Sequence, residues 1–210
     1  MLRRAARDIV AGMTVNLGIG LPTQVLKYVP DDLAVCLHSE NGMSGVGVQT
    51  PAGKENRNLI DAGGSYVSVR PGGAFFDSAV SFAIVRSGRL DLSLLGAFEV
   101  AANGDLANWI IPGRFTPGAG GAIELAQKAR QVAVITTHTD KKGRPKIVER
   151  CQLPLTAAGR VRRIYTDMAV CEITPDGLHL VEIAEGSTVE DVVNATGAPL
   201  IIPQAPIPTF

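Results

Sequence analysis

The sequence is built around one stretch, Leu33-Ala34-Val35-Cys36-Leu37-His38-Ser39-Glu40-Asn41-Gly42. Its apolar first half predicts a short buried strand, and its second half breaks abruptly into polar residues and glycine. Glycines let the backbone approach a ligand closely and let N–H groups point inward. Ligands of α/β proteins dock at the carboxyl ends of strands, so this break is a candidate binding site. Taken alone, however, a glutamate in such a turn is usually a solvated surface residue.

Length and charge limit the kind of protein. The 210 residues suffice for a substantial core, and we expect a single domain over residues 1–200 with a loose, proline-rich tail over residues 201–210. Twenty basic residues balance twenty acidic ones, so the charge does not indicate a nucleic-acid partner. No apolar run approaches the ~20 residues that a membrane span requires. The N-terminus lacks the apolar segment of a signal peptide.

The cysteines and histidines indicate the compartment and the metal content. Cys36, Cys151 and Cys171 lie in apolar, strand-like contexts, and an odd number of cysteines cannot form a fully paired framework. We therefore expect a reducing, cytoplasmic location. The three histidines are far apart and no Cys/His ligand spacing surrounds them, so we expect no metal site.

Strands and short helices alternate through most of the chain. Apolar runs predict strands at residues 14–17, 66–69, 90–95 and 132–136, and other patterns predict helices at residues 5–10, 22–28, 122–129 and between Asp77 and Gly88. The last third is richer in strands and closes with a helix capped by Ser187-Thr188-Val189-Glu190. This order predicts an α/β fold with an open, mostly parallel sheet flanked by helices and a partly antiparallel C-terminal end. The fold alone does not indicate a function.

Two glycine-rich loops precede predicted helices. The first is Gly18-Ile19-Gly20, and the second is Pro117-Gly118-Ala119-Gly120-Gly121. A strand, a glycine loop and a helix N-terminus together present backbone N–H groups to an anion or an oxyanion. The Gly-x-Gly pair is weak evidence by itself, because a plain tight turn has the same pattern and the third glycine of a dinucleotide fingerprint is absent.

Six segments together resemble the B (β) subunit of the family I CoA-transferases, which include the 3-oxoacid, acetoacetate/butyrate and 3-oxoadipate enzymes. The resemblance covers residues 2–199, and its specificity comes from the order and spacing of Val15–Thr23, Ser39–Gly42, Phe75–Ala79, Gly104–Trp109, Gly118–Ala122 and Cys151–Thr156. It implies the fold shared with ribose-5-phosphate isomerase and glucosamine-6-phosphate deaminase. It also implies a separately encoded A (α) subunit, an α2β2 heterotetramer, and acyl-CoA and carboxylic acid substrates.

The same resemblance implies that Glu40 is the nucleophile. Glutamate suits this role because an ordinary glutamate has a pKa near ~4.3, so it is ionised at neutral pH and needs no general base. Attack on an acyl-CoA gives an acyl-glutamyl anhydride, and the released CoA thiolate converts it to a glutamyl-CoA thioester. A second acid reverses the sequence. The implied function is ping-pong transfer of CoA from a donor such as succinyl-CoA or acetyl-CoA to a carboxylic or 3-oxo acid, without a tightly bound cofactor.

Each tetrahedral intermediate of this reaction needs oxyanion donors, worth roughly 3–4 kcal/mol each. The backbone groups that we expect to bind the oxyanion or CoA are those of Gly18, Gly20, Asn41, Gly42, Gly118, Gly120 and Gly121. Many family members have Lys-Gly-Met-Gly-Gly in place of Pro117-Gly118-Ala119-Gly120-Gly121. Because the lysine and methionine are missing, the detailed coenzyme contacts of the family are not carried over to this loop, and a different acyl group is an open alternative.

Two other functions stay open on the sequence. A two-subunit acyl-CoA hydrolase or a ring-cleaving enzyme on the same fold would release free CoA without an acceptor, although the retained Ser39-Glu40-Asn41-Gly42 sequence argues against it. A sugar-phosphate-binding effector module would bind a phosphosugar and ignore acyl-CoA, although no DNA-binding segment is evident.

Overall fold

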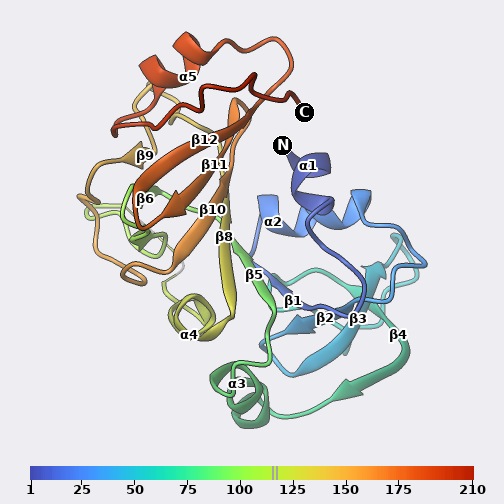
Figure 1. Ribbon diagram of the computed structural model, residues 1–210. Helices are drawn as coiled ribbons and strands as arrows, with labels where there is room; N and C mark the ends of the chain where they lie inside the picture. The colour runs from blue at the N-terminus through green and yellow to red at the C-terminus, as the bar shows by residue number, and fades with distance from the viewer. Residues whose placement is uncertain (115, 117) are drawn as a thin grey trace.

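The computed structural model describes residues 1–114, 116 and 118–210, and its centre is a nine-stranded sheet (Figure 1). In sheet order the strands are β12 (Gly177–Ile183), β11 (Ala169–Thr174), β10 (Val161–Tyr165), β8 (Gln131–Ile135), β5 (Leu92–Leu95), β1 (Thr14–Leu17), β2 (Cys36–Ser39), β3 (Met43–Gln49) and β4 (Val67–Phe75). The strands from β10 to β2 are parallel to one another. The predicted α/β fold with a mostly parallel sheet is confirmed.

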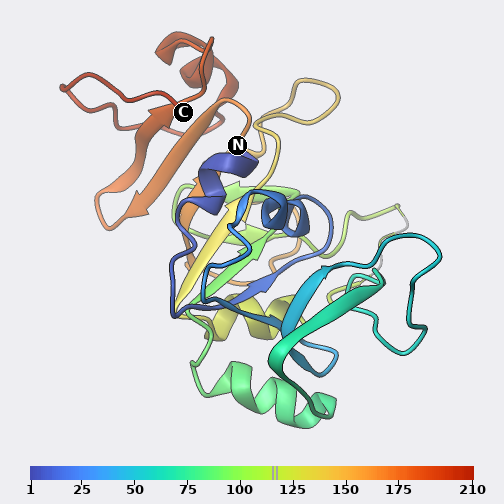
Figure 2. The ribbon, with the colours of Figure 1, turned by 90° about the vertical axis from the view of Figure 1, so that its right-hand side faces the viewer.

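Antiparallel strands extend the sheet at both edges, and Figures 1 and 2 show these two arms at opposite ends of the molecule. The arm made by β11 and β12 is the antiparallel C-terminal end that the sequence predicts. The arm made by β3 and β4 is not predicted beyond residues 66–69, because its glycines resemble loop residues. A Cβ on Gly45 would lie 2.8 Å from the Cα of Gly73, so these glycines let the two strands approach closely.

Short helices cover both faces of the sheet. One face carries α1 (Leu2–Ala6), α2 (Leu21–Gln24) and the 3-10 helix η1 (Val25–Tyr28), and the other carries α3 (Ser78–Arg86) and α4 (Ala122–Lys128). The side chain of Asp77 caps α3 by accepting a hydrogen bond from the N–H of Val80. The closing helix α5 (Val189–Ala195) is capped by Thr188 with Asp191, one residue later than the predicted Ser187 box.

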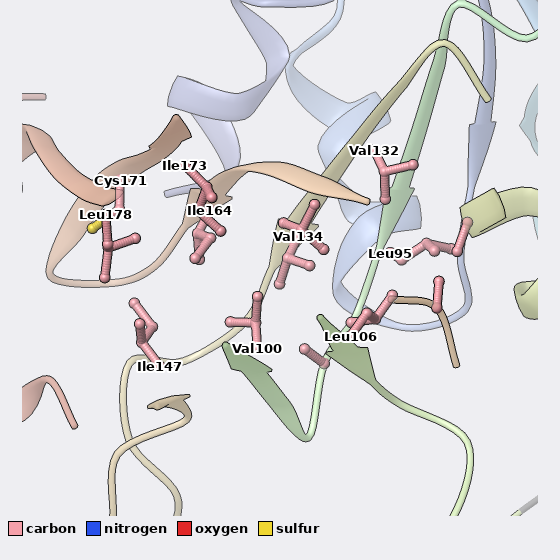
Figure 3. Packing of buried hydrophobic residues seen from close by; sticks show 14 of the residues in the cluster. Leu95, Val100, Leu106, Val132, Val134, Ile147, Ile164, Cys171, Ile173 and Leu178 are labelled. Atoms are coloured by element: carbon pink, nitrogen blue, oxygen red, sulfur yellow. The ribbon is translucent and has the colours of Figure 1, made fainter. Parts of the chain in front are cut away.

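Two hydrophobic clusters form the core, one on each face of the sheet. Leu92 and Leu94 of β5 enter the cluster under α1, whereas Leu95 enters the cluster under α3 and α4, because neighbouring side chains of a strand point to opposite faces. The second cluster also buries a small sheet of β7 (Leu106–Ala107), β6 (Glu99–Ala101) and β9 (Ile147–Val148). Figure 3 shows Val100 of these short strands facing Val134, and Ile147 on the side of Leu178, within the same cluster. The core therefore fixes the central parallel strands from both sides.

The segment of residues 201–210, expected as a loose tail, lies along β12. The N–H of Leu180 donates to the carbonyl of Ile201, and the N–H of Ile183 donates to the carbonyl of Pro208. Proline lacks an N–H but keeps its carbonyl acceptor, so a proline-rich segment can still pair with an edge strand.

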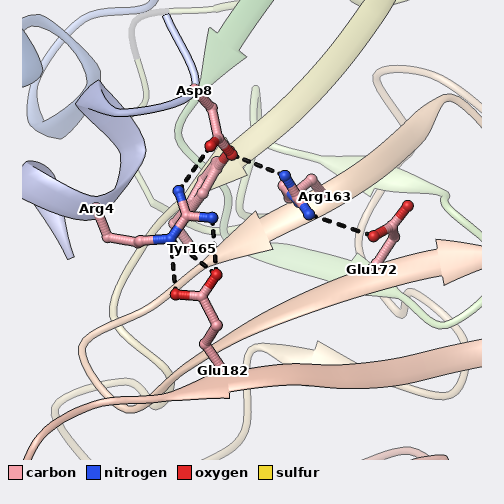
Figure 4. A network of polar contacts seen from close by, with 6 residues as sticks. All are labelled: Arg4, Asp8, Arg163, Tyr165, Glu172 and Glu182. Carbon is pink, nitrogen blue, oxygen red and sulfur yellow. Dashed lines mark hydrogen bonds and ion pairs between the residues drawn. The ribbon is translucent and has the colours of Figure 1, made fainter. Parts of the chain in front are cut away.

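A polar network connects α1 to the far edge of the sheet (Figure 4). Arg4 donates to Asp8 at 2.7 Å and to Glu182 of β12 at 2.7 Å. Asp8 also accepts from Arg163 at 2.8 Å and from the Tyr165 hydroxyl, both on β10. These contacts attach the first helix to strands that follow about 150 residues later in the chain.

Candidate active site

Glu40 directly follows β2, at the carboxyl edge of the parallel strands. The chain turns sharply there, because the N–H of Gly42 donates to the carbonyl of Ser39 at 3.0 Å. Gly42 has φ +118°, and a Cβ at this position would lie 2.0 Å from the carbonyl oxygen of Phe76. Glycine is therefore required for the turn, and the turn leaves the Glu40 side chain half-buried.

Two distant segments contact the Glu40 side chain. On β1, Asn16 donates from Nδ2 to Glu40 Oε2 at 3.2 Å. From the loop before α4, Gly121 lies so close that a Cβ there would be 3.1 Å from Glu40 Cγ and 3.3 Å from Oε1. The two carboxylate oxygens thus have different surroundings: an amide holds Oε2, whereas Oε1 lies against the glycine loop.

The backbone N–H groups of the other predicted site residues differ in whether they already donate a hydrogen bond within the fold. The N–H of Gly18 donates to the carbonyl of Leu94 at 2.8 Å and that of Gly42 donates to Ser39, so both are already used within the fold. Within the described part of the chain, no backbone carbonyl accepts from Gly120 or Gly121. Because Gly121 lies close to Glu40, the N–H groups of this loop are candidates to bind a group beside the carboxylate.

In the described part of the chain, no side-chain hydrogen bond joins the remaining predicted residues, Gly20, Asn41 and Gly118, to the Glu40 carboxylate. Gly20 has φ +92° and precedes α2, with open space where a Cβ would be. Gly118, with φ +92°, belongs to the loop that contains Gly121, and Pro117 of that loop lies outside the described residues. Asn41 is exposed, and its Nδ2 donates to the carbonyl of Ile60 at 2.7 Å.

A row of buried polar side chains lies beneath Glu40. His38, Asn16 and Ser93 occupy partner positions on β2, β1 and β5, and Ser81 of α3 covers His38. None of the four residues is more than 4% exposed. Asn16 Nδ2 donates to the His38 carbonyl at 3.1 Å and lies 3.3 Å from His38 Nδ1, while His38 Nε2 lies 3.0 Å from Ser81 Oγ.

This polar row is costly for folding. Buried polar groups destabilise a core unless they are hydrogen-bonded, and two of these atoms, Asn16 Oδ1 and Ser93 Oγ, have no partner among residues 1–114, 116 and 118–210. An apolar side chain would fill either position at lower cost. Asn16, which has one of these unpaired atoms, also holds Glu40 Oε2, so the polar row adjoins the Glu40 carboxylate.

His38 is held as a neutral ring. Burial lowers the pKa of His38 to about 4, so the ring carries no charge at neutral pH. The ring stacks on Phe76, with a centroid separation of 6.2 Å. A neutral imidazole has one N–H donor and one acceptor nitrogen, so His38 can accept from one neighbour and donate to another.

A cavity of about 390 Å³ lies beside this centre, mainly on the opposite face of β1 and β2. Apolar side chains such as Leu17 and Leu37 line it together with polar residues of α2, β3 and the loop at residues 61–65. The loop is tied to the end of β2, because the N–H of Ala62 donates to Ser39 Oγ at 2.9 Å. Glu40 itself does not line this cavity, but the two residues that precede it, His38 and Ser39, do.

Sequence reasoning does not identify Asn16 and His38 as site residues. The pattern Val15-Asn16-Leu17 predicts a strand but gives the polar residue at its centre no role. The alternation of side chains along a strand could have identified Asn16. A polar side chain between two core-facing residues points to the opposite face of the sheet, and in a parallel sheet helices cover that face too. The partner of Asn16 is 24 residues away in Glu40, which sequence spacing alone does not reveal.

Comparison with known proteins gives consistent matches. The family model described as coenzyme A transferase matches residues 1–195. The beta subunit of a probable coenzyme A transferase from Bacillus subtilis (strain 168) is 47% identical over 200 residues, covering 95% of this chain and 92% of that protein. The B subunit of the 3-oxoadipate CoA-transferase of Acinetobacter baylyi is 48% identical over 200 residues, with the same coverage of 95% and 92%. The B subunit of the succinyl-CoA:3-ketoacid coenzyme A transferase of Helicobacter pylori (strain 26695) is 44% identical over 198 residues, covering 94% and 95%.

Solved structures share the fold. The acyl-CoA transferase YdiF from Escherichia coli O157:H7, as the apoenzyme, matches with a TM-score of 0.80 at 22% identity, over 100% of this chain and 42% of that chain. This chain therefore spans less than half the length of YdiF. The same enzyme has been solved as a thioester complex with CoA, which matches with a TM-score of 0.75 at 23% identity, again over 100% and 42%. Glutaconate coenzyme A-transferase from Acidaminococcus fermentans matches with a TM-score of 0.71 at 17% identity, over 99% and 88%.

Proposed function

The chain belongs to the coenzyme A transferase family, and we propose that Glu40 is the nucleophile of its transfer reaction. Its relatives are named as B or beta subunits, and the chain is the B subunit of a CoA-transferase. The main observation in support of this role is that the two carboxylate oxygens of Glu40 have different neighbours. Asn16 holds Oε2 at 3.2 Å, whereas Oε1 lies against the loop of Gly120 and Gly121.

The proposed reaction begins when Oε1 attacks the carbonyl carbon of an acyl-CoA. The carbon–sulfur bond breaks, CoA leaves as a thiolate, and an acyl-glutamyl anhydride forms. The thiolate then attacks Cδ of Glu40, the bond from Cδ to Oε1 breaks, and the first acid leaves as a carboxylate. The acceptor acid attacks the resulting glutamyl-CoA thioester, and the same steps run in reverse.

The negative charge of the intermediates falls in two places. During the first attack it develops on the oxygen of the substrate acyl group, where backbone N–H groups of Gly120 and Gly121 are the nearest candidate donors. During attack on Cδ it develops on Oε2, which Asn16 Nδ2 already contacts. Asn16 therefore adds a side-chain donor to the backbone donors expected from the sequence.

The names of the relatives support a substrate class. We propose an acyl-CoA donor such as succinyl-CoA or acetyl-CoA, and a carboxylic or 3-oxo acid acceptor, with CoA as substrate and transient thioester. The relatives are single subunits of larger enzymes, and YdiF has more than twice the length of this chain, which supports a separate A subunit as partner. We propose an α2β2 assembly in the cytoplasm.

Substitution of Glu40 tests the proposal. The chain is co-expressed with the A subunit, and transfer from succinyl-CoA or acetyl-CoA to several acids is measured for the wild type, Glu40→Ala and Glu40→Gln. We expect both variants to lose at least about 10³-fold in kcat, since neither can form an acyl-enzyme. The exposed Glu149→Gln is the matched control and should retain activity.

Two results would count against the proposal. Normal transfer by Glu40→Ala would remove Glu40 from the chemistry. Continuous release of free CoA by the wild type in the absence of an acceptor acid would instead indicate an acyl-CoA hydrolase.

A further inference from the structure

We propose that His38 is a positioning residue that keeps the Asn16 amide oriented with its NH2 group, and not its oxygen, toward Glu40. This inference rests on the proposed role of Glu40 as nucleophile. His38 does not contact the reacting atoms with its ring, and it acts through Asn16.

The groups around the Asn16 amide determine which of its two ends faces Glu40. An asparagine amide can be turned by 180°, which exchanges its donor and acceptor ends. On the oxygen side, no donor in the described part of the chain holds Oδ1. The orientation therefore depends on the acceptors around Nδ2, and His38 supplies two of the three: its carbonyl at 3.1 Å and its ring Nδ1 at 3.3 Å.

The third acceptor, Glu40 Oε2, changes its charge during the reaction. As a free carboxylate it attracts the NH2 group strongly, but in the anhydride and in the thioester it is an uncharged carbonyl oxygen. The carbonyl and the ring Nδ1 of His38 take no part in these covalent changes, so both stay available as acceptors for Nδ2. His38 is therefore what keeps the donor end in place when the next attack on Cδ returns negative charge to Oε2.

The hydrogen-bond pattern fixes the form of the ring. Nδ1 faces the donor end of Asn16, so it must be the acceptor nitrogen, and the proton resides on Nε2. Nε2 then donates to Ser81 Oγ at 3.0 Å. Ser81 is fully buried on α3 and thereby links the orientation of the amide to the helix that covers it.

Kinetics of the complete two-subunit enzyme test this role. We compare His38→Phe, which keeps an aromatic ring against Phe76 but has no acceptor, with His38→Gln, whose amide supplies an acceptor and a donor. The measured quantities are kcat, KM for succinyl-CoA, and the rate at which CoA becomes attached to Glu40. We expect His38→Phe to lower kcat and the attachment rate by about 10- to 100-fold with KM nearly unchanged, and His38→Gln to restore most of the loss.

A double substitution distinguishes an effect of His38 on the position of Asn16 from a general structural effect of replacing His38. If His38 acts through Asn16, His38→Phe should cost little further activity in an Asn16→Ala background. The control His179→Phe changes a half-buried histidine on β12, at the far edge of the sheet, and should leave the kinetics unchanged.

The protonation state of the His38 ring can be measured in the wild type by NMR, so this test does not depend on whether the variants fold correctly. The chain has three histidines, so selective 15N labelling of histidine gives a simple spectrum, in which loss of one set of signals in His38→Gln assigns His38. We expect a neutral ring with its proton on Nε2 at neutral pH. A proton on Nδ1, wild-type kcat in His38→Phe, or equal losses in His38→Phe and His38→Gln would overturn the inference. If the wild type itself forms no thioester at Glu40, the proposed function fails instead.

Discussion

In the proposed reaction, the role of Glu40 depends on which of its two oxygens is held by a neighbour. Asn16 contacts Oε2, while Oε1 and Cγ lie against Gly121. Glu40 is thus confined between an amide beneath it and a glycine above it. Neither neighbour is charged, and Oε1 lies against the loop of Gly121.

Gly121→Ala tests this confinement. Gly121 has φ −80°, which alanine adopts without strain, but the added Cβ would lie 3.1 Å from Glu40 Cγ and 3.2 Å from Phe82 Cζ. We expect the variant to fold with an almost unchanged melting temperature and to lose about 10-fold or more in kcat, because Glu40 must shift. An unchanged kcat with succinyl-CoA would show that the close approach is not required for the reaction.

At the residue scale, the sequence singles out Glu40 and the glycines as candidates, but not the side chains that the structure places around Glu40. Ser39-Glu40-Asn41-Gly42 is a recognisable motif, and glycine loops before helices are visible by composition. Asn16 and His38 come together only because β1 and β2 pair in the register that opposes them. That register depends on tertiary packing, so the sequence of either strand alone does not predict it.

The arm formed by β3 and β4 shows how glycine shapes an element. Gly45 has φ +71°, and its missing side chain leaves room for the Cα of Gly73 on the neighbouring strand. This arm carries β2 on its inner side, so its packing determines how the chain leaves Glu40. The arm is hard to predict, because a glycine-rich strand lacks the β-branched residues that identify strands.

Gly45→Ala should destabilise the protein more than an equivalent change at an open position. Gly53 is the matched control, since it has φ +82° but nothing within 4 Å of its Cβ position. Both variants incur the strain of a positive φ, about 1–2 kcal/mol. We expect Gly45→Ala to cost at least about 1 kcal/mol more in the free energy of unfolding, measured by urea denaturation. Equal losses would mean that the strands separate there without cost.

At the scale of the whole molecule, long-range contacts join the ends of the chain. The sequence predicts the α/β class because strands and helices alternate, but it does not predict the strand order or the pairing of Arg4 with Glu182, which lie 178 residues apart. The network around Asp8 also has a consequence for acid stability. Burial opposes ionisation of this carboxyl, but hydrogen bonds from Tyr165 and Arg4 prevail and lower the pKa of Asp8.

A lowered pKa in the folded state means that Asp8 stabilises the fold above its unfolded pKa of about 3.8 and loses this contribution as pH falls through the folded value. We expect Asp8→Asn to lower the free energy of unfolding by about 1–3 kcal/mol at pH 7, and the difference from the wild type to shrink below about pH 4. Asp176→Asn, at an exposed turn, is the control. A difference that is constant from pH 7 to pH 3 would contradict this assignment.

The most direct test of whether Glu40 forms a thioester with CoA is the mass of the peptide that contains Glu40. The complex of both subunits is incubated with succinyl-CoA alone, quenched in acid and digested. We expect one CoA bound to Glu40 through a bond that hydroxylamine cleaves, and loss of this CoA when acceptor acid is added before quenching. An unmodified Glu40 peptide from an enzyme that still transfers CoA would contradict it.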